Sequence, residues 1–392
     1  RPVPVGVAGQ RSGLNRERFP GLSDGWARLD APGGSQPVDA AIEAMAAFMR
    51  SGAMANQGGV FKAAEQVDAL MAEARETVGE FLGGDPRGVA FGSSMTSLTL
   101  AFSAAVGRTL SEGDEIVCTR LDHDGNVAPW LIAASRAGAS VRFAEPDRET
   151  LELPASSIEP LLSGRTRWVA VTAASNAVGT VPELDAIVAA THDAGACVYV
   201  DAVHATPHRR IDAAKLGVDA LACSAYKWFG PHESVLWARP ELLEELTPDK
   251  LRPASDTVPW RWETGTPAFE SLAGAIAAAR YLMETGFDAI RAHEDALMTR
   301  MLDGLGSIAG VTLYGAARDR TPTAMFTVAG RNADEVAGAL AAEKVAVWNG
   351  NYYALELSRF LELEPHGAVR AGLVHYNDES DVDRLVAAVE RL

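Results

Sequence analysis

Short apolar runs rich in β-branched side chains recur through the middle of the chain, and segments with helical spacing separate most of them. The helical segments lie near residues 126–138 and 183–194. The apolar runs predict strands at residues 88–92, 115–119, 140–145, 167–175, 197–203, 220–224 and 234–239. Strands that alternate with helices are typical of a mostly parallel sheet covered by helices on both faces. The pattern therefore predicts an α/β fold.

The two ends of the chain have a different pattern. Helical spacing is present at residues 36–51 and 61–83, before the first predicted strand. After about residue 285, helical runs are followed by strand-like segments and a closing helix, at residues 323–328, 345–350, 368–376 and 380–392. We therefore expect a large domain of residues 52–285 and a smaller α/β domain that combines residues 1–51 with 286–392.

The charge balance restricts the class of partner. The chain has 392 residues, with 52 acidic and 35 basic side chains and a formal net charge of −17. No basic stripe compensates this charge, which argues against a nucleic acid or an anionic membrane as a partner. A small-molecule substrate remains compatible with it.

The cysteines and the apolar stretches indicate a compartment. Cys118, Cys197 and Cys223 each lie in or beside an apolar strand-like run and form no CxxC pair, which is typical of buried thiols in a reducing environment. Residues 1–13 contain no apolar core of the length of a signal peptide, and no stretch has the length of a membrane helix. We expect a cytoplasmic protein.

Polar side chains follow the carboxyl ends of five predicted strands, where ligands bind in an open α/β sheet. Ser93 to Ser97 form a run rich in hydroxyls that either caps a helix or holds a phosphate on free N–H groups. His123 is either a loop residue or a metal ligand, and no second His or Cys cluster accompanies it, so we expect no metal. The other strand ends deliver Asn176, Asp201 and Lys227.

Lys227 has an unusual context for a lysine. It follows a small apolar strand and lies between Tyr226 and Trp228. Burial there lowers the pKa of an ammonium group, which is what a Schiff-base nucleophile needs. A solvated surface lysine is the alternative, and the flanking aromatic residues argue against it.

Taken together, these side chains predict a site for pyridoxal phosphate. That cofactor needs a lysine for an imine, a carboxylate at its pyridinium nitrogen, a phosphate cup and a flat group stacked on its ring. Lys227, Asp201, the 93–97 turn and His123 match these four needs. Asp201 precedes Lys227 by 26 residues (227 − 201), enough for a crossover between two strands.

At these positions the chain resembles the class V aminotransferases, and among them the cysteine-desulfurase-like proteins of fold-type I. The resemblance extends from "ARLDAPGGS" at residues 27–35 to "RAGLVHYNDESDVDRLV" at residues 370–386. It implies a fold-type I transferase fold and a homodimer with shared sites. Thr266, in "ETGTP", resembles the residue that reaches the cofactor phosphate of a neighbouring subunit.

The resemblance also implies roles for individual residues. Lys227 is the imine lysine, Asp201 faces the pyridinium nitrogen, and His123 matches the histidine that stacks on the ring. Arg370, in "VRAGLVHYN", matches the arginine that holds the substrate carboxylate. The remaining implied contacts are Ser94, Met95, Thr96, Ser224 and Tyr226 around the phosphate, and Asn176 and His204 near the phenolic oxygen, with Asn176 also at the substrate.

One departure from the family pattern bears on the reaction. Desulfurases carry a nucleophilic cysteine on a loop that reads "NYYALELS" here, and Tyr353 occupies the matching place. A persulfide relay needs a thiolate, so we expect no sulfur transfer by that route. Tyr352 and Tyr353 are either packing residues or substrate contacts.

The leading hypothesis is an enzyme that uses pyridoxal phosphate to act on a small amino acid or an amino-acid conjugate. An external aldimine and a carbanion at Cα would precede β-elimination of the C–S lyase type, with Lys227 as general base and His123 as a possible proton shuttle. Transamination, epimerisation and oxidative deamination are alternatives on the same scaffold.

A cofactor-holding protein without activity would need loss of a central residue. A nucleotide-binding enzyme would need a G-x-G-x-x-G or a P-loop lysine, which the early strands lack.

Overall fold

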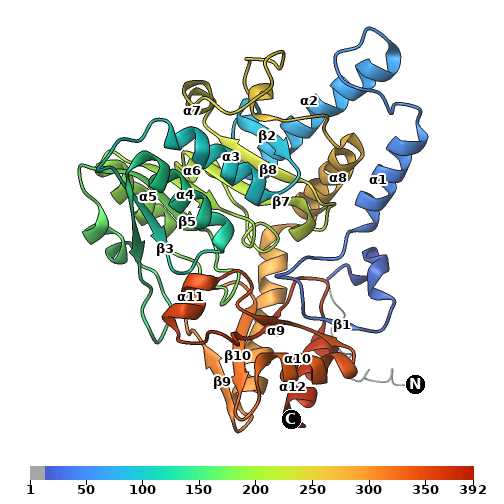
Figure 1. The fold of residues 1–392 in the computed structure, drawn as a ribbon. Helices are drawn as coiled ribbons and strands as arrows, with labels where there is room; N and C mark the ends of the chain where they lie inside the picture. Colours follow the sequence, from blue (N-terminus) through green and yellow to red (C-terminus); the bar gives the residue numbers. More distant parts are fainter. Residues whose placement is uncertain (1–13) are drawn as a thin grey trace.

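Seven strands form a central sheet in the order β2-β8-β7-β6-β5-β3-β4 (Figure 1). The computed structural model describes residues 14–392, so residues 1–13, where the sequence predicts no signal peptide, lie outside the described part. Strands β3 to β7 pair in parallel, whereas β8 is antiparallel to both of its neighbours, β2 and β7. The bounds are β2 Val89–Gly92, β3 Glu115–Thr119, β4 Ser140–Ala144, β5 Thr166–Thr172, β6 Cys197–Asp201, β7 Ala220–Ser224 and β8 Ser234–Ala238. The predicted mostly parallel sheet is confirmed, although the strands predicted at 167–175 and 197–203 end earlier.

Alternation along each strand divides the core between two layers of helices. On β7, Leu221 and Cys223 pack in one hydrophobic cluster, and Ala220 and Ala222 pack in another. The first cluster includes residues of α2 (Lys62–Leu82), α5 (Leu184–Asp193) and α8 (Phe269–Thr285). The second includes residues of α3 (Met95–Gly107), α4 (Ala128–Ala137) and α7 (Pro240–Glu245). Because successive strand residues point to opposite faces, strands covered on both sides must be apolar at nearly every position.

A second, antiparallel sheet has the order β12-β13-β10-β9 (Figure 1). Its strands are β9 Val311–Tyr314, β10 Thr323–Val328, β12 Trp348–Gly350 and β13 Ala368–Gly372. It shares a core with α9 (Phe287–Gly306), α10 (Ala333–Ala342) and α12 (Glu379–Glu390). The helix α11 (Leu355–Phe360) lies between β12 and β13 in the sequence.

The strand predicted at residues 345–350 is wrong as a single element. It consists of β11 (Val345–Ala346) and β12, which belong to different sheets. β11 pairs in parallel with β1 (Ala27–Arg28), and β12 pairs with β13. This division places Trp348 of β12 directly opposite Arg370 of β13.

The N-terminal segment contacts both parts of the fold. β1 pairs with β11, and the Leu14 N–H donates to the carbonyl of His375 at 2.8 Å. The following helix, α1 (Asp39–Arg50), packs on α8 beside the central sheet (Figure 1). Among the described residues, no helix combines the length and the apolar character that crossing a bilayer requires. The domain boundaries at residues 51 and 285 stay a prediction.

Candidate active site

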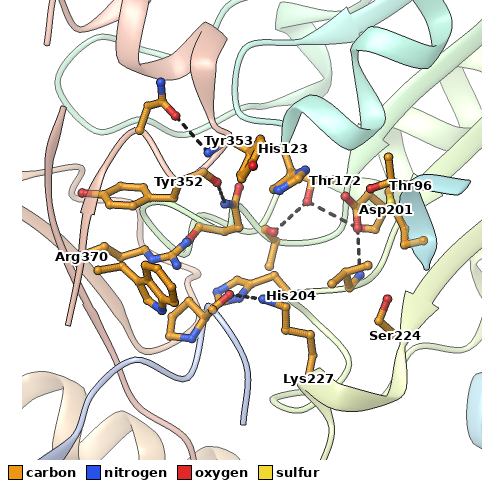
Figure 2. Close-up of a pocket in the computed structure, with 18 of the residues that line it drawn as sticks. Thr96, His123, Thr172, Asp201, His204, Ser224, Lys227, Tyr352, Tyr353 and Arg370 are labelled. Carbon is orange, nitrogen blue, oxygen red and sulfur yellow. Dashed lines mark hydrogen bonds between the residues drawn. The ribbon is translucent and has the colours of Figure 1, made fainter. Parts of the chain in front are cut away.

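A cavity of about 560 Å³ opens at the carboxyl ends of the central strands (Figure 2). The strand order reverses at β3, because β4 lies on one side of it and β5 on the other, and such a switch point leaves a crevice. Figure 2 shows Arg370 and Tyr352 on one side of the cavity and Asp201, Thr96 and Ser224 on the other. Most predicted site residues line it: Ser94, Met95, Thr96, His123, Asn176, Asp201, His204, Ser224, Tyr226, Lys227, Tyr352, Tyr353 and Arg370. Thr266 is exposed and does not line this cavity.

Lys227 and Asp201 are buried, and each keeps one polar contact. The ammonium group of Lys227 donates to the carbonyl of Pro32, and the Val203 N–H donates to Asp201 Oδ1 at 2.9 Å. Burial raises the pKa of Asp201 to about 6, although that N–H and the charge of Lys227 act in the opposite direction. Burial also lowers the pKa of Lys227 to about 7, assisted by Arg370 and opposed by Asp201. At neutral pH the lysine is therefore partly an uncharged amine, the form that attacks a carbonyl carbon.

His123 presents a neutral ring to the cavity. Its Nδ1 accepts the Gly125 N–H at 2.9 Å, which places the ring proton on Nε2. Burial, assisted by the charges of Lys227 and Arg370, lowers the pKa of His123 to about 4. The ring stacks on Tyr353, with the centroids 5.3 Å apart and the planes at 29°.

The first turn of α3 faces the cavity. Ser94 caps this helix, because its hydroxyl accepts the Ser97 N–H at 3.1 Å. The helix cap and the phosphate site that the 93–97 run predicts are thus compatible. Ser94 caps the helix, and the remaining N–H groups of the first turn can bind an anion. On the same side of the cavity, the hydroxyl of Ser224 lies 2.8 Å from that of Ser234.

Arg370 lies on β13 and is almost fully buried, at 3% exposure. It donates from Nη1 to the carbonyl of Asn176 at 2.8 Å, and its guanidinium carbon lies 4.5 Å from the centroid of the Tyr352 ring. The Asn176 side chain donates to the carbonyl of Tyr352 at 3.0 Å. Arg370 Nε and Asn176 Oδ1 are buried without a partner among the described residues. Unsatisfied buried donors and acceptors are expected where a ligand binds.

His204 has a fixed orientation next to the small sheet. Its Nε2 lies 3.0 Å from the hydroxyls of both Thr321 and Thr323. Burial lowers the pKa of His204 well below the usual value, and the neighbouring His208 adds to this effect. The imidazole is therefore neutral.

The lining residues that the sequence analysis missed include Pro32, Gly33, Thr172 and Trp348. Thr172 is the last residue of β5, and its hydroxyl donates to the carbonyl of Ala174 at 2.7 Å. The rule of polar residues at strand ends would have found Thr172 only if the strand predicted at 167–175 had been ended at residue 172, where β5 ends. Pro32 and Gly33 carry no polar side chain, and Trp348 lies within a predicted strand, so no comparable signal marks them.

The comparison with known proteins agrees with this geometry. The model of the family described as "Aminotransferase class-V" matches residues 27–385. The chain belongs to the class V aminotransferase family.

Several known proteins are similar to the chain over nearly its whole length. An uncharacterized protein of Mycobacterium tuberculosis is 34% identical over 96% of the chain and 98% of its own length. A cysteine desulfurase of Klebsiella pneumoniae is 32% identical over 93% and 92%. Among solved structures, a cysteine desulfurase from Thermococcus onnurineus has a TM-score of 0.91 at 26% identity, and the alignment covers 98% of the chain and 99% of that structure. The predicted fold-type I architecture is confirmed.

The class V assignment makes the chain a pyridoxal-phosphate-dependent enzyme, and the cavity fits this cofactor. It offers a buried amine, a buried carboxyl, the first turn of a long helix and a neutral aromatic ring. Its volume lies within the range of small-molecule sites, roughly 300–1,000 Å³. Residues of the described chain form no group of three or more side chains suited to a metal.

The cysteines of this class V aminotransferase lie away from the site. Cys118 and Cys223 are buried, as predicted, whereas Cys197 is partly exposed, which corrects the expectation of three buried thiols. Within the described chain no cysteine lines the cavity, and it is Tyr353 of the 351–358 loop that stacks on His123.

Proposed function

We propose that the enzyme is a lyase that eliminates a sulfur substituent from the β-carbon of a small amino-acid conjugate. The observation that carries this proposal is the set of Lys227, Asp201 and Arg370 around one cavity whose described lining contains no thiol. Relatives of the chain are named cysteine desulfurases and therefore process a bond between the β-carbon and sulfur. A site that breaks this bond without a persulfide-forming cysteine releases a thiol, in which the sulfur is still bonded to its original substituent.

The side chains divide the work of this reaction. Arg370 binds the carboxylate of the substrate through its fork of N–H donors. Pyridoxal phosphate, when bound, supplies the electron sink for the pair left at Cα. The amine of Lys227 accepts the proton from Cα, Asp201 holds a proton at the pyridine nitrogen, and the ring of His123 provides a flat neutral contact. The Cβ–S bond then breaks with its electron pair on sulfur, which takes up the proton held by Lys227, and water converts the remaining enamine into pyruvate and ammonia.

We also propose that the enzyme acts as a homodimer in the cytoplasm, with Thr266 at the cofactor phosphate of the partner subunit. Support comes from the 263–267 loop, which is firmly anchored at its start while Thr266 is exposed. Arg75 donates to both carboxylate oxygens of Glu263, at 2.8 and 3.0 Å, and this pair is buried. A Thr266→Ala variant should bind the cofactor more weakly without a change in oligomeric state. Titration followed by the visible absorption of the bound cofactor, with light scattering for the mass, tests this.

The reaction is tested with the purified holoenzyme and a set of S-substituted L-cysteines. We expect equal amounts of pyruvate, ammonia and thiol without any added keto acid, and none of them from a Lys227→Ala variant. The family description favours transamination as a second candidate. Keto product that forms only when an acceptor keto acid is present would establish transamination and contradict the lyase proposal.

A further inference from the structure

Two aromatic side chains that line the cavity remain largely exposed. Tyr353 is 71% exposed and Trp348 is 47% exposed, whereas Lys227, Asp201 and Arg370 are each at most 9% exposed. Aromatic rings at the rim of a ligand cavity offer a large apolar area and a π face. These two rings therefore mark the part of the cavity that faces the outer end of a substrate.

Tyr353 is held in place by its backbone. Tyr352 and Tyr353 both have left-handed backbone conformations, with φ of 52° and 60°. The carbonyl of Tyr353 accepts the Asp124 N–H at 2.6 Å, and its N–H donates to Asn351 Oδ1 at 3.1 Å. Two consecutive non-glycine residues in this conformation are unfavourable, and such strain clusters at ligand clamps. The strained loop turns an exposed ring onto His123 instead of into the core.

Trp348 is positioned relative to Arg370. The two residues are direct partners in the antiparallel pair of β12 and β13, so their side chains leave the sheet on the same face. Gly33 makes room for the indole, because a Cβ at that position would collide with Trp348 Nε1. A ligand whose carboxylate is bound by Arg370 thus has the indole as a neighbour.

We propose that the substrate is an amino acid whose side chain ends in a planar aromatic group, and that this group binds against the exposed faces of Tyr353 and Trp348. The inference rests on the proposed function, which places the substrate carboxylate at Arg370. A saturated ring of equal size buries a similar apolar area but cannot stack on these rings. Stacking on two aromatic faces is expected to favour the aromatic ligand by about tenfold in affinity.

The test separates binding from reaction. The probes are L-homophenylalanine and its cyclohexyl counterpart, which match in length but contain no sulfur to eliminate. Titration of the holoenzyme, followed by the visible absorption of the bound cofactor, gives both dissociation constants. Wild type should prefer the aromatic probe by about tenfold. Tyr353→Ala and Trp348→Ala should each remove most of this preference, and Tyr353→Phe, which keeps the ring, should retain it.

Three other outcomes overturn the inference. Equal affinity of wild type for both probes would exclude an aromatic site, and a preference that survives both alanine variants would place it elsewhere. If either variant changes the mass of the enzyme in solution, the rings cover a second copy of the chain and not a substrate. Absence of pyruvate from S-phenyl-L-cysteine, with the probe preference intact, contradicts only the lyase proposal.

Discussion

Asp201 and Lys227 reach one cavity from the ends of two neighbouring parallel strands, β6 and β7. Asp201 ends β6, and Lys227 ends the short turn that follows β7. Burial moves the pKa of the carboxyl up to about 6 and that of the amine down to about 7, so their mutual attraction is too weak to offset the loss of hydration. The site is thus prepared for chemistry at the expense of stability.

The first prediction concerns the stability of the cofactor-free protein. A Lys227→Met variant should be more stable than wild type at pH 7, by roughly 3–5 kcal/mol, because methionine fills the space without a charge to desolvate. The pKa of Lys227 is depressed on folding, so wild type loses stability as the pH falls from about 10.5 to about 7. The advantage of the variant should therefore be largest at pH 7 and smaller at pH 9. Asp201 titrates at lower pH and leaves this window unaffected.

Urea denaturation at pH 7 and pH 9 measures this difference. Lys215→Met is the matched control, since Lys215 is exposed, and it should change stability by less than about 0.5 kcal/mol at both values. A Lys227→Met protein that is less stable than wild type at pH 7 would show that the ammonium group is stabilised by contacts stronger than the Pro32 carbonyl and Asp201.

A second prediction addresses the recognition of the carboxylate. Arg370→Lys keeps a positive charge but loses the planar fork, so kcat/KM for the amino acid should fall by about 100-fold or more. Wild type should strongly prefer an amino acid over its amide, and the variant should lose most of this preference. Steady-state kinetics with both compounds gives the two ratios.

Arg320→Lys provides the control for this experiment. Arg320 is half-buried, and it donates to the backbone carbonyls of Val178, Gly315 and Thr323 and does not line the cavity. Its substitution should reduce stability and leave the ratio of acid to amide unchanged. An unaltered ratio in Arg370→Lys would assign the carboxylate to another group.

The sequence predicted the site best where reactive side chains directly follow the ends of strands. Lys227, Asp201 and His123 follow strands whose apolar runs are unmistakable, and parallel strands bring their carboxyl ends to one edge. The wall formed by Trp348 could not be predicted, because the run at 345–350 contains no signal that divides it into two strands of different sheets. Gly33 and Pro32 contribute shape and a backbone carbonyl, which no side-chain pattern reveals.

A third prediction tests the fit between Gly33 and Trp348. Gly33→Ala should displace the indole, which reduces stability by roughly 1–3 kcal/mol and weakens binding of an aromatic probe. In the double variant with Trp348→Ala, the added methyl group meets open space, so its effect on stability should largely disappear. A double-mutant cycle in urea measures this coupling. Additive effects would mean that the methyl group is accommodated without moving the indole.

The buried pair of His208 and Glu294 carries the fourth prediction. His208 Nδ1 lies 2.9 Å from Glu294 Oε2, both side chains are at most 5% exposed, and the pair connects α9 to the segment that bears His204. Glu294→Ala leaves the imidazole buried without its partner and should reduce stability by about 3 kcal/mol, whereas Glu294→Gln keeps a hydrogen bond and should lose about 1 kcal/mol.

Burial raises the pKa of Glu294 above its usual value, although His208 opposes this shift. Wild type therefore loses stability as the pH rises above about 4.5, and the deficit of the Gln variant, which cannot ionise, should shrink in the same direction. Urea denaturation at pH 5 and pH 8 measures the change in wild-type stability and the change in the deficit of the Gln variant. An alanine variant as stable as wild type would show that the pair makes no net contribution to stability.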